Sequence, residues 1–368
     1  MTRAAFIGDD SLWQRGHPPG HPLRPERLRN TWEMLQAYGA LDHPNTHVAP
    51  PRRAAEEELA VFHTWEYINA VRKLSQGDRS VNAARYGFGP GDNPVFEGMF
   101  ETEALKVGAA LVGVELLLAG KADVAFSFSG GLHHASPDYA SGFCIFGDAA
   151  VAIHHLLAAR QRVAYVDIDA HHGDGVQAAF YDDPRVLTIS FHESGHFLFP
   201  GTGFTGETGT GSGEGYSANV PLFPATDDET FLWAFDEIVP PLVTRFSPDL
   251  VVAQLGVDAH WRDPLTHLAL TTHGFEALFQ RIHGLSPRWL ALGGGGYAQD
   301  VVPRAWTIAW GIMSEQSLLD TLPAPIASHY NPPHLHDALP APLTPQQREQ
   351  ARAAAETTVR EVKRLLKL

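Results

Sequence analysis

The sequence predicts an α/β protein in which one open, parallel sheet is covered by helices on both faces. Short apolar stretches that suit strands alternate with longer stretches of helical periodicity along most of the 368 residues, and this alternation is typical of a parallel sheet. No strong linker divides the pattern and no segment repeats. We therefore expect residues 1–368 to form a single domain.

Local signals define the elements expected in the first third of the chain. Pro25 suits the first turn of a helix on which Leu28 and Leu35 share one face. Thr64 is a suitable N-cap, and Gly120 is a suitable residue at which to end a helix. The expected elements are a strand over residues 3–7 and helices over 25–38, 56–62, 64–74 and 94–119, with an exposed loop over 80–93.

Strands and helices alternate more regularly after residue 120. The expected strands cover residues 122–128, 162–166, 185–191, 249–255 and 288–292. The expected helices cover residues 148–160, 176–181, 229–246, 273–283, 301–313 and 344–368. Residues 200–216 are rich in Gly and Thr and residues 314–343 carry Pro and His, so both are expected to be irregular. Thr344 and Pro345 suit the start of the charged, Ala-rich terminal helix.

The composition excludes several classes of protein. A hydrophobic content of 44% allows a sizeable core, a charged fraction of 19% is not that of a disordered chain, and a net charge of −15 argues against a general nucleic-acid binder. The single cysteine, Cys144, excludes an internal disulfide framework and suits a reducing cytoplasm. Because we find neither a signal peptide nor an apolar run of about 18 residues, we expect a cytoplasmic protein with no membrane span.

Acids and imidazoles follow the strand over 162–166 directly. The run is Val166-Asp167-Ile168-Asp169-Ala170-His171-His172-Gly173-Asp174-Gly175. In an extended chain Asp167, Asp169 and His171 share one face, because side chains alternate with a period of two. Carboxylate oxygens with an imidazole nitrogen are typical ligands of zinc, with iron or manganese as alternatives. The run therefore predicts a metal site at the end of this strand.

Open parallel sheets place their sites beyond the carboxyl ends of the strands, and a second ligand-type residue stands at such an end. Asp258 follows the strand over 249–255. With Asp169 and His171 it makes a set of three ligands from two strand ends. Three protein ligands leave a position for water and substrate, which is the catalytic rather than the structural arrangement.

Two more strand ends carry groups that suit catalysis. His133 and His134 follow a Gly-Gly turn after the strand over 122–128, and Tyr297 follows four glycines after the strand over 288–292. Asp167 and Asp174 are left as carboxylates that could fix the tautomers of two imidazoles. Tyr297 could donate a hydrogen bond to a developing oxyanion.

Two other patterns are decoys. The segment 201–206 matches G-x-G-x-x-G, but it does not join a strand to a helix, so dinucleotide binding is not expected. Cys144 is more typical of a small buried residue than of a nucleophile.

Taken together and in order, these residues resemble the zinc-dependent histone deacetylase family. The resemblance covers roughly residues 17–313, and its details resemble the bacterial acetoin-utilisation branch. The motifs that carry it are Gly131-Leu132-His133-His134-Ala135, Gly142-Phe143-Cys144, Asp167-Ile168-Asp169-Ala170-His171-His172-Gly173-Asp174-Gly175-Val176-Gln177, Phe199-Pro200-Gly201-Thr202-Gly203, Gly256-Val257-Asp258 and Gly293-Gly294-Gly295-Gly296-Tyr297.

The resemblance implies the arginase/deacetylase fold, one catalytic zinc ion and a role for each motif residue. The implied zinc ligands are Asp169, His171 and Asp258. The implied catalytic residues are His134 backed by Asp174 as general base and acid, His133 backed by Asp167 as its electrostatic partner, and Tyr297.

A narrow channel for an aliphatic chain is implied as well. Its implied lining is Gly142, Phe143 and Phe199 along the wall, Leu265 near the mouth, Asp92 at the rim and Arg27 in an inner cavity for acetate. His260 and Trp261 stand where nuclear relatives have smaller residues, and this departure affects the expected rim.

The family further suggests one or two monovalent cations, usually K⁺, with Na⁺ as the alternative. The implied residues of the first cation site are Asp167, Asp169, His171, Ser190 and Phe191. The implied residues of the second are Phe180, Asp183, Val186 and Tyr216.

The leading hypothesis is a zinc amidohydrolase that removes acetyl or related acyl groups from lysine side chains of proteins or peptides and releases acetate. The alternative within enzymes is an acetylpolyamine or other small acylated-amine amidohydrolase, against which Leu265 argues because an acidic residue near the mouth would suit a second ammonium group better. A non-catalytic acyl-lysine or metal-binding module is a third hypothesis. Arginase-like chemistry needs two metal ions, and one clear ligand set argues against it.

Overall fold

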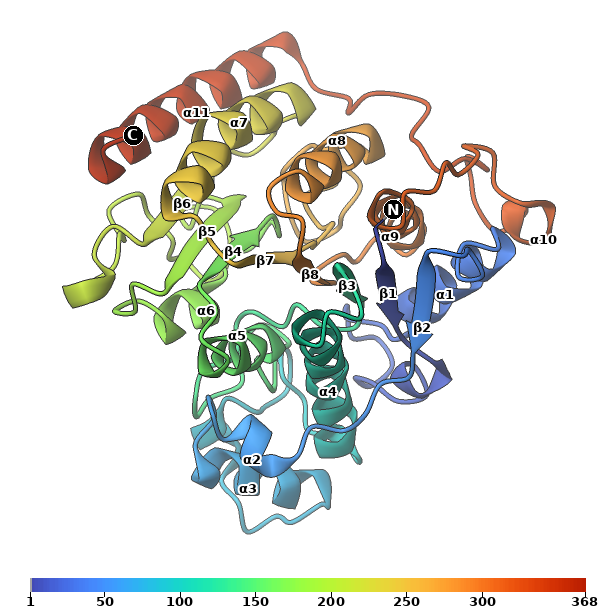
Figure 1. The fold of residues 1–368 in the computed structure, drawn as a ribbon, viewed down its shortest axis with the longest axis vertical. Helices are drawn as coiled ribbons and strands as arrows, with labels where there is room; N and C mark the ends of the chain where they lie inside the picture. Colours follow the sequence, from blue (N-terminus) through green and yellow to red (C-terminus); the bar gives the residue numbers. More distant parts are fainter. Residues whose placement is uncertain (1) are drawn as a thin grey trace.

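Eight strands form one parallel sheet in the computed structural model, which describes residues 2–368 (Figure 1). The order of the strands across the sheet is β2-β1-β3-β8-β7-β4-β5-β6, and every pair of neighbours is parallel. The strands are β1 (Ala4–Ile7), β2 (Thr46–Ala49), β3 (Val124–Ser127), β4 (Val163–Asp167), β5 (Val186–Glu193), β6 (Ser217–Leu222), β7 (Leu250–Gln254) and β8 (Trp289–Leu292). The predicted fold class is confirmed.

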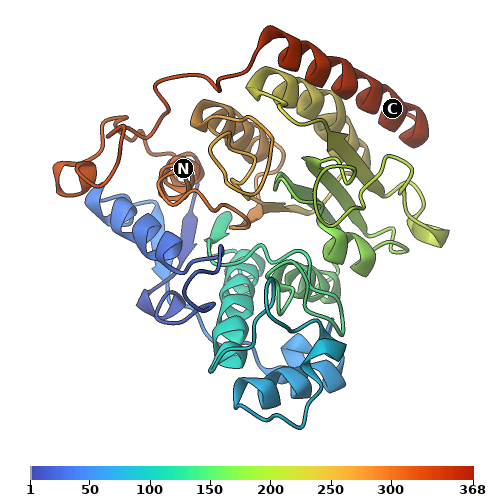
Figure 2. The same ribbon diagram turned by 180° about the vertical axis from the view of Figure 1, so that it is seen from behind.

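Helices cover both faces of the sheet. Figures 1 and 2 show α4 and α5 on one face, with α2 and α3 outside them, and α1, α9, α8 and α7 on the other. The helices are α1 (Glu26–Ala37), α2 (Glu56–Leu59), α3 (Trp65–Ser75), α4 (Met99–Leu118), α5 (Asp148–Ala158), α6 (Asp174–Ala179), α7 (Asp228–Phe246), α8 (Thr272–His283), α9 (Val301–Met313), α10 (Ala324–Ala327) and α11 (Pro345–Leu366). Among residues 2–368, none of them combines the length and the apolar character needed to cross a bilayer.

Successive residues of a strand bury into opposite cores. Phe6 packs into the core beneath α1 and α9, whereas its neighbour Ile7 packs into the core beneath α4 and α5. Both side chains have no exposed surface. A strand with two buried faces has to be apolar at nearly every position, which is why the central strands were recognisable in the sequence.

The two edge strands, β2 and β6, were missed by the sequence analysis. β6 contains Pro221, which lacks the N–H that a central strand needs and is tolerated at an edge. β2 is only partly buried, so its sequence lacks a continuous apolar run. The structure therefore extends the predicted sheet by one strand on each side.

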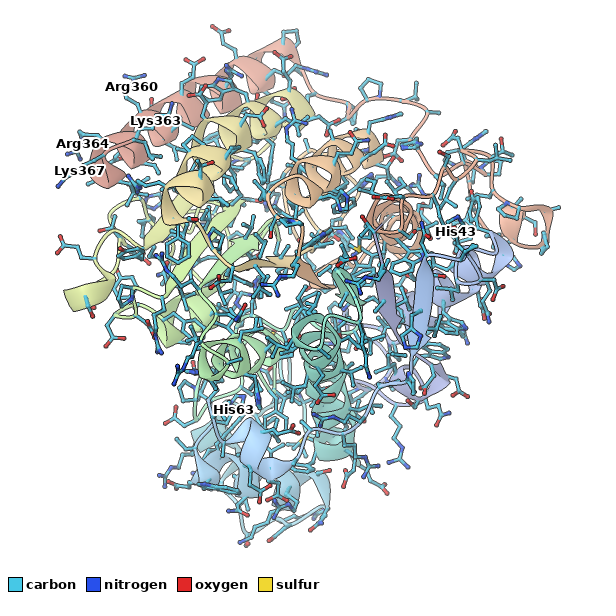
Figure 3. All side chains as sticks on the ribbon, in the orientation of Figure 1. His43, His63, Arg360, Lys363, Arg364 and Lys367 are labelled. Atoms are coloured by element: carbon cyan, nitrogen blue, oxygen red, sulfur yellow. The ribbon has the colours of Figure 1, made fainter. Side chains whose placement is uncertain are left out.

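The terminal helix α11 covers the edge formed by β6. The Thr358 hydroxyl donates to the Pro221 carbonyl at 3.1 Å, which occupies one polar group of an otherwise open edge. The last turns of α11 and the residue that follows the helix carry basic side chains at the outer rim of the molecule, Arg360, Lys363, Arg364 and Lys367 (Figure 3). Positive charge at a helix C-terminus is favourable because of the helix dipole.

The segment between α9 and α11 is held to the neighbouring elements by the hydrogen bonds and ion pair of a buried aspartate. Asp337 in this segment is 8% exposed and accepts hydrogen bonds from Arg304 of α9 (3.1 Å), from the Thr272 amide of α8 (2.9 Å) and from His260 (2.8 Å). Burial alone would raise the pKa of Asp337, but these partners outweigh burial and hold that pKa well below its ordinary value. His260 has no exposed surface, so it does not form the rim for which it was considered.

We predict that Asp337→Asn lowers the free energy of unfolding by about 3–5 kcal/mol, because removing one partner leaves a buried cation uncompensated. The stabilisation is fully present at neutral pH, above the pKa of an unfolded aspartate, and is lost as the pH falls through the depressed folded pKa. Urea unfolding at pH 7 measures the loss.

Asp236→Asn is the matched control for this prediction. Asp236 also pairs with an arginine, Arg281 at 2.7 Å, but the two side chains are 48% and 35% exposed. Its loss should cost at most about 1 kcal/mol. Equal costs in the two variants would contradict the role assigned to Asp337.

Candidate active site

The three predicted metal ligands meet at the carboxyl edge of the sheet. Asp169 and His171 follow β4, and Asp258 follows β7, the neighbouring strand. His171 Nδ1 lies 3.1 Å from Asp169 Oδ1 and 2.9 Å from Asp258 Oδ2. Their exposed fractions are 1% for Asp169, 8% for His171 and 0% for Asp258.

The charges of this set suit a bound cation. Burial, together with the negative charge of Asp169, raises the pKa of Asp258 to about 7. Burial works against a charged His171, but Asp169 and Asp258 outweigh it and raise the pKa of His171 well above its usual range. One oxygen from each of two buried carboxylates lies within 3.1 Å of an imidazole nitrogen, and these three donors are a set that fits zinc. The residues present therefore fit the metal that the resemblance implies.

Each carboxylate of the set is oriented by donors on its far side. Asp169 Oδ2 accepts hydrogen bonds from the Gln254 side-chain amide and from the Gly295 N–H, both at 2.7 Å. Asp258 Oδ1 accepts from the Ala170 N–H at 2.7 Å. Such outer partners fix the direction in which a ligand presents its other oxygen.

Glycine is required where the loops approach these carboxylates. A Cβ atom at Gly256 would lie 2.2 Å from Asp169 Oδ2, and one at Gly295 would lie 2.2 Å from Asp258 Oδ2. No side chain fits at such distances. The glycines after β7 and β8 therefore let the backbone itself pack against the metal ligands.

The histidine pair lies beside the ligand set, each ring held by a carboxylate. His133 Nδ1 is 2.8 Å from Asp167, and His134 Nδ1 is 2.7 Å from Asp174. The two Nε2 atoms are 3.1 Å apart, and His133 Nε2 is 3.9 Å from Asp169. The four residues are therefore paired as the sequence analysis expected.

The two imidazoles differ in basicity. Burial opposes a charge on His133, but Asp167 and Asp169 outweigh burial and raise its pKa to about 9. Burial and the charge of His133 lower the pKa of His134 to about 4. His133 is therefore the more basic of the two imidazoles, and His134 is the one that is unprotonated at neutral pH.

Tyr297 faces the ligand set from the other side. Its ring centre lies 6.5 Å from that of His171, and its backbone N–H donates to Asp263 at 2.8 Å. Burial and the negative charges of Asp258 and Asp169 raise the pKa of Tyr297 well above 10. The phenol therefore keeps its proton and is a hydrogen-bond donor at neutral pH.

Aromatic rings wall the approach to the ligand set. Phe143 packs edge-on against Tyr297 with ring centres 5.8 Å apart, and Phe199 packs edge-on against His134 at 5.1 Å. Gly142, the residue before Phe143, packs against both His134 and Phe199, since a Cβ there would be 2.4 Å from His134 and 2.9 Å from Phe199. Phe199 is 43% exposed and thus marks the outer end of this wall.

The predicted rim residue Asp92 is connected to this wall through His21. Asp92 is exposed, and its backbone carbonyl lies 3.1 Å from His21 Nε2. The His21 ring packs against Phe143 with centres 4.6 Å apart. Leu265 is half-buried, with its N–H donating to Asp263 at 3.0 Å.

Arg27 lies beneath the glycine-rich loop. Its guanidinium donates to the carbonyls of Gly294 (2.6 Å) and Gly296 (3.4 Å) and lies over the Trp306 ring. It also lines a small cavity together with His17 and other residues. Arg27 is therefore buried and supports the loop that carries Tyr297, while its expected role in an inner cavity for acetate stays a prediction.

Both residue sets proposed for monovalent cations stay predictions. In the first set, Asp167 of β4 pairs with Ser190 of β5, so the two are neighbours across the sheet. In the second set, Phe180 and Asp183 lie between α6 and β5, and the Tyr216 carbonyl accepts a hydrogen bond from Thr188 N–H.

Three residues of the site were missed by the sequence analysis. Tyr165 donates its hydroxyl to Asp167 at 2.7 Å, Gln254 bonds Asp169, and Asp263 holds the backbone of Tyr297. A signal existed for two of them. Tyr165 stands two residues before Asp167 on the same face of β4, and Gln254 is the one polar residue of an otherwise apolar strand.

Comparison with known proteins places the chain in a family. Residues 21–313 match the histone deacetylase domain. The chain is 44% identical over 318 residues to the acetoin utilization protein AcuC of Bacillus subtilis, covering 84% of this chain and 82% of that protein. It is 39% identical over 340 residues to the AcuC protein of Staphylococcus aureus, covering 90% and 85%.

Solved structures agree with these sequence matches. A crystal structure of an HDAC homolog from Aquifex aeolicus superimposes with a TM-score of 0.88 at 31% identity, and the match covers 97% of this chain and all of that one. A crystal structure of an HDAC homolog complexed with SAHA superimposes with a TM-score of 0.87 at the same identity and coverage.

We predict that Gln254→Leu weakens binding of a divalent metal ion by about 10–100-fold, the usual cost of losing a residue that orients a ligand. The leucine keeps the volume but cannot donate to Asp169. Competition with a chromophoric chelator measures the affinity, and thermal unfolding verifies that the variant is folded. An affinity equal to that of the wild type would show that Gln254 does not orient Asp169.

Proposed function

The chain belongs to the histone deacetylase family and is a deacetylase of that family, and on this basis we propose that it is zinc-dependent and removes acetyl groups from lysine side chains of proteins or peptides. The observation that carries the proposal is the meeting of the buried ligand set with two carboxylate-backed histidines and a phenol.

The proposed zinc ion would be held by Asp169, His171 and Asp258. When bound, such an ion supplies a Lewis acid that polarises an amide carbonyl and makes water a better nucleophile at neutral pH. The remaining chemistry falls to the side chains around it.

Proton transfer is assigned to His134. Its Nδ1 is engaged by Asp174 at 2.7 Å, so its Nε2 is the nitrogen that can take a proton. Its lowered pKa of about 4 leaves that nitrogen unprotonated at neutral pH. His134 then takes a proton from the attacking water and returns it to the amine as the carbon–nitrogen bond breaks, which yields acetate and a free amine.

His133 is assigned an electrostatic role. Asp167 and Asp169 raise its pKa to about 9, so it carries a positive charge beside the reacting groups. The Nε2 atoms of His133 and His134 are 3.1 Å apart. A positive charge on His133 therefore lowers the pKa of His134.

Tyr297 is assigned to the oxyanion. Water attack turns the carbonyl oxygen into an anion, and a neutral donor can share its charge without adding charge to the site. The hydrogen bond from the Tyr297 N–H to Asp263 fixes the backbone from which the phenol extends.

The surroundings support a long, unbranched amine as the substrate. The rings of Phe143 and Phe199 offer apolar contact to an aliphatic chain, and the exposed carboxylate of Asp92 can accept a hydrogen bond from a peptide backbone at the entrance. A lysine side chain within a peptide has both features. A small polyamine has the first feature only.

A panel of substrates tests the proposal. Purified protein is assayed for acetate release from acetyl-lysine peptides and for amine release from longer acyl-lysine peptides and acetylated polyamines. We expect hydrolysis of the acetyl-lysine peptides that stops with a chelator and returns with zinc. Preference for polyamines would favour the alternative substrate class, and an inert protein would overturn the proposal.

Linear hydroxamates give an independent check through the metal. A hydroxamate group can chelate the proposed zinc ion, and one structural relative was solved in complex with SAHA. We expect compounds of this class to bind in the slot between Phe143 and Phe199 and to inhibit more strongly than a hydroxamate too wide for that slot.

We predict that Tyr297→Phe lowers kcat by about 10²–10³-fold, the usual cost of losing one oxyanion donor. The substitution removes only the hydroxyl, so zinc content and thermal stability should be unchanged. Steady-state kinetics on an acetyl-lysine peptide measure the loss. Tyr330→Phe, in the segment before α11, serves as the control and should retain kcat; a fully active Tyr297→Phe would exclude the oxyanion role.

A further inference from the structure

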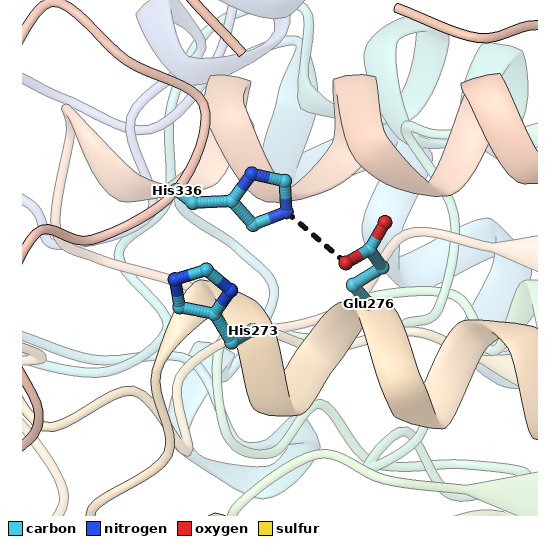
Figure 4. Close-up of side chains that lie close together, drawn as sticks. All are labelled: His273, Glu276 and His336. Atoms are coloured by element: carbon cyan, nitrogen blue, oxygen red, sulfur yellow. Dashed lines mark ion pairs between the residues drawn. The ribbon is translucent and has the colours of Figure 1, made fainter.

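A second cluster of metal-binding side chains lies away from the active site. His273 and Glu276 stand one turn apart on α8, and His336 belongs to the segment between α10 and α11. One donor atom from each lies within 4.8 Å of the others. Figure 4 shows the three side chains pointing toward one another.

The outer nitrogen of each imidazole is occupied by an acceptor. His336 Nδ1 lies 2.7 Å from Asp320 Oδ1, and His273 Nε2 lies 3.2 Å from the Asp337 carbonyl. Each acceptor favours the tautomer in which the hydrogen is on the ring nitrogen that it contacts. The free lone pairs are then on His336 Nε2 and His273 Nδ1. A histidine that ligates a metal commonly donates its other N–H to a carboxylate or a carbonyl in this way.

The free lone pair of His336 faces another acceptor. His336 Nε2 lies 3.3 Å from Glu276 Oε2, yet this nitrogen is buried and has no hydrogen-bond partner. Two acceptors at this distance repel each other unless a cation stands between them. A proton would join one nitrogen to one oxygen, whereas a metal ion would use all three donors.

The spacing suits a transition metal. Donor atoms in a tetrahedral zinc site are about 3.4 Å apart when the bonds are about 2.1 Å long, and the contact between His336 and Glu276 is already 3.3 Å. The rings of His273 and His336 stack at 4.6 Å with an angle of 17°. The exposed ring of His273 has to turn slightly from this stacked position to aim its Nδ1 at an ion held by His336 and Glu276. Two imidazoles and one carboxylate favour zinc, nickel or copper over magnesium or calcium.

We propose that His273, Glu276 and His336 bind a divalent transition metal ion, with zinc as the first choice, that fastens the segment between α9 and α11 to α8. This segment carries Asp337, which holds Arg304 and Thr272. The ion would join two elements on the surface, with water completing its coordination, and it lies apart from the reacting groups. The proposal is independent of the proposed function.

Metal counting tests the proposal. The wild type, His273→Ala and Glu276→Gln are dialysed against buffered zinc that saturates the wild type, and bound zinc is measured by mass spectrometry. We expect both variants to hold one ion fewer per chain than the wild type, with deacetylase activity retained. His47→Ala, which removes an exposed histidine of β2, is the control and should hold as many ions as the wild type.

Two further measurements separate this site from the active site. Asp258→Ala should lose the active-site ion and keep the one at His273. Zinc should raise the melting temperature of Asp258→Ala but not that of Asp258→Ala combined with His273→Ala. Equal zinc content in the wild type, His273→Ala and Glu276→Gln would overturn the proposal, whatever the activity of the protein.

Discussion

Two buried aspartates at adjacent strand ends are the constraint on which the rest of the structure depends. An unpaired carboxylate in a protein interior is so unfavourable that it has to be neutralised or paired. Asp169 and Asp258 meet this requirement together, through His171 between them and through N–H donors behind them. The strands that precede them, β4 and β7, are direct neighbours in a parallel sheet. Both strands therefore end at the same edge of the sheet, which brings the two carboxylates close together.

The loops around these carboxylates are shaped by the space that the carboxylates leave. Gly256 and Gly295 bring backbone within a distance that no side chain allows. The loop after β8 is then held from two sides, by Arg27 on its carbonyls and by Asp263 on the N–H of Tyr297. The position of the phenol thus follows from charged residues that take no direct part in the chemistry we propose.

Buried charged and polar side chains also connect the sheet to the elements that surround it. His260 stands two residues after Asp258 and contacts Asp337, and Asp337 contacts α8 and α9. A segment with little regular structure is therefore tied to the strand end that carries a metal ligand. The proposed ion at His273, Glu276 and His336 would add a second attachment to the same segment.

The sequence by itself determined the sheet and the chemistry of its edge. Strands buried on both faces must be apolar, so the central ones were visible, and the polar residues that follow them stood out as site residues. The edge strands β2 and β6 escaped because an edge tolerates exposed positions and Pro221. What only the tertiary structure decided is which distant residues become partners: Gln254 meets Asp169 because β7 lies beside β4, and His336 meets Glu276 because an irregular segment folds back over α8. Such contacts depend on strand order and chain path, and neither leaves a local periodicity in the sequence.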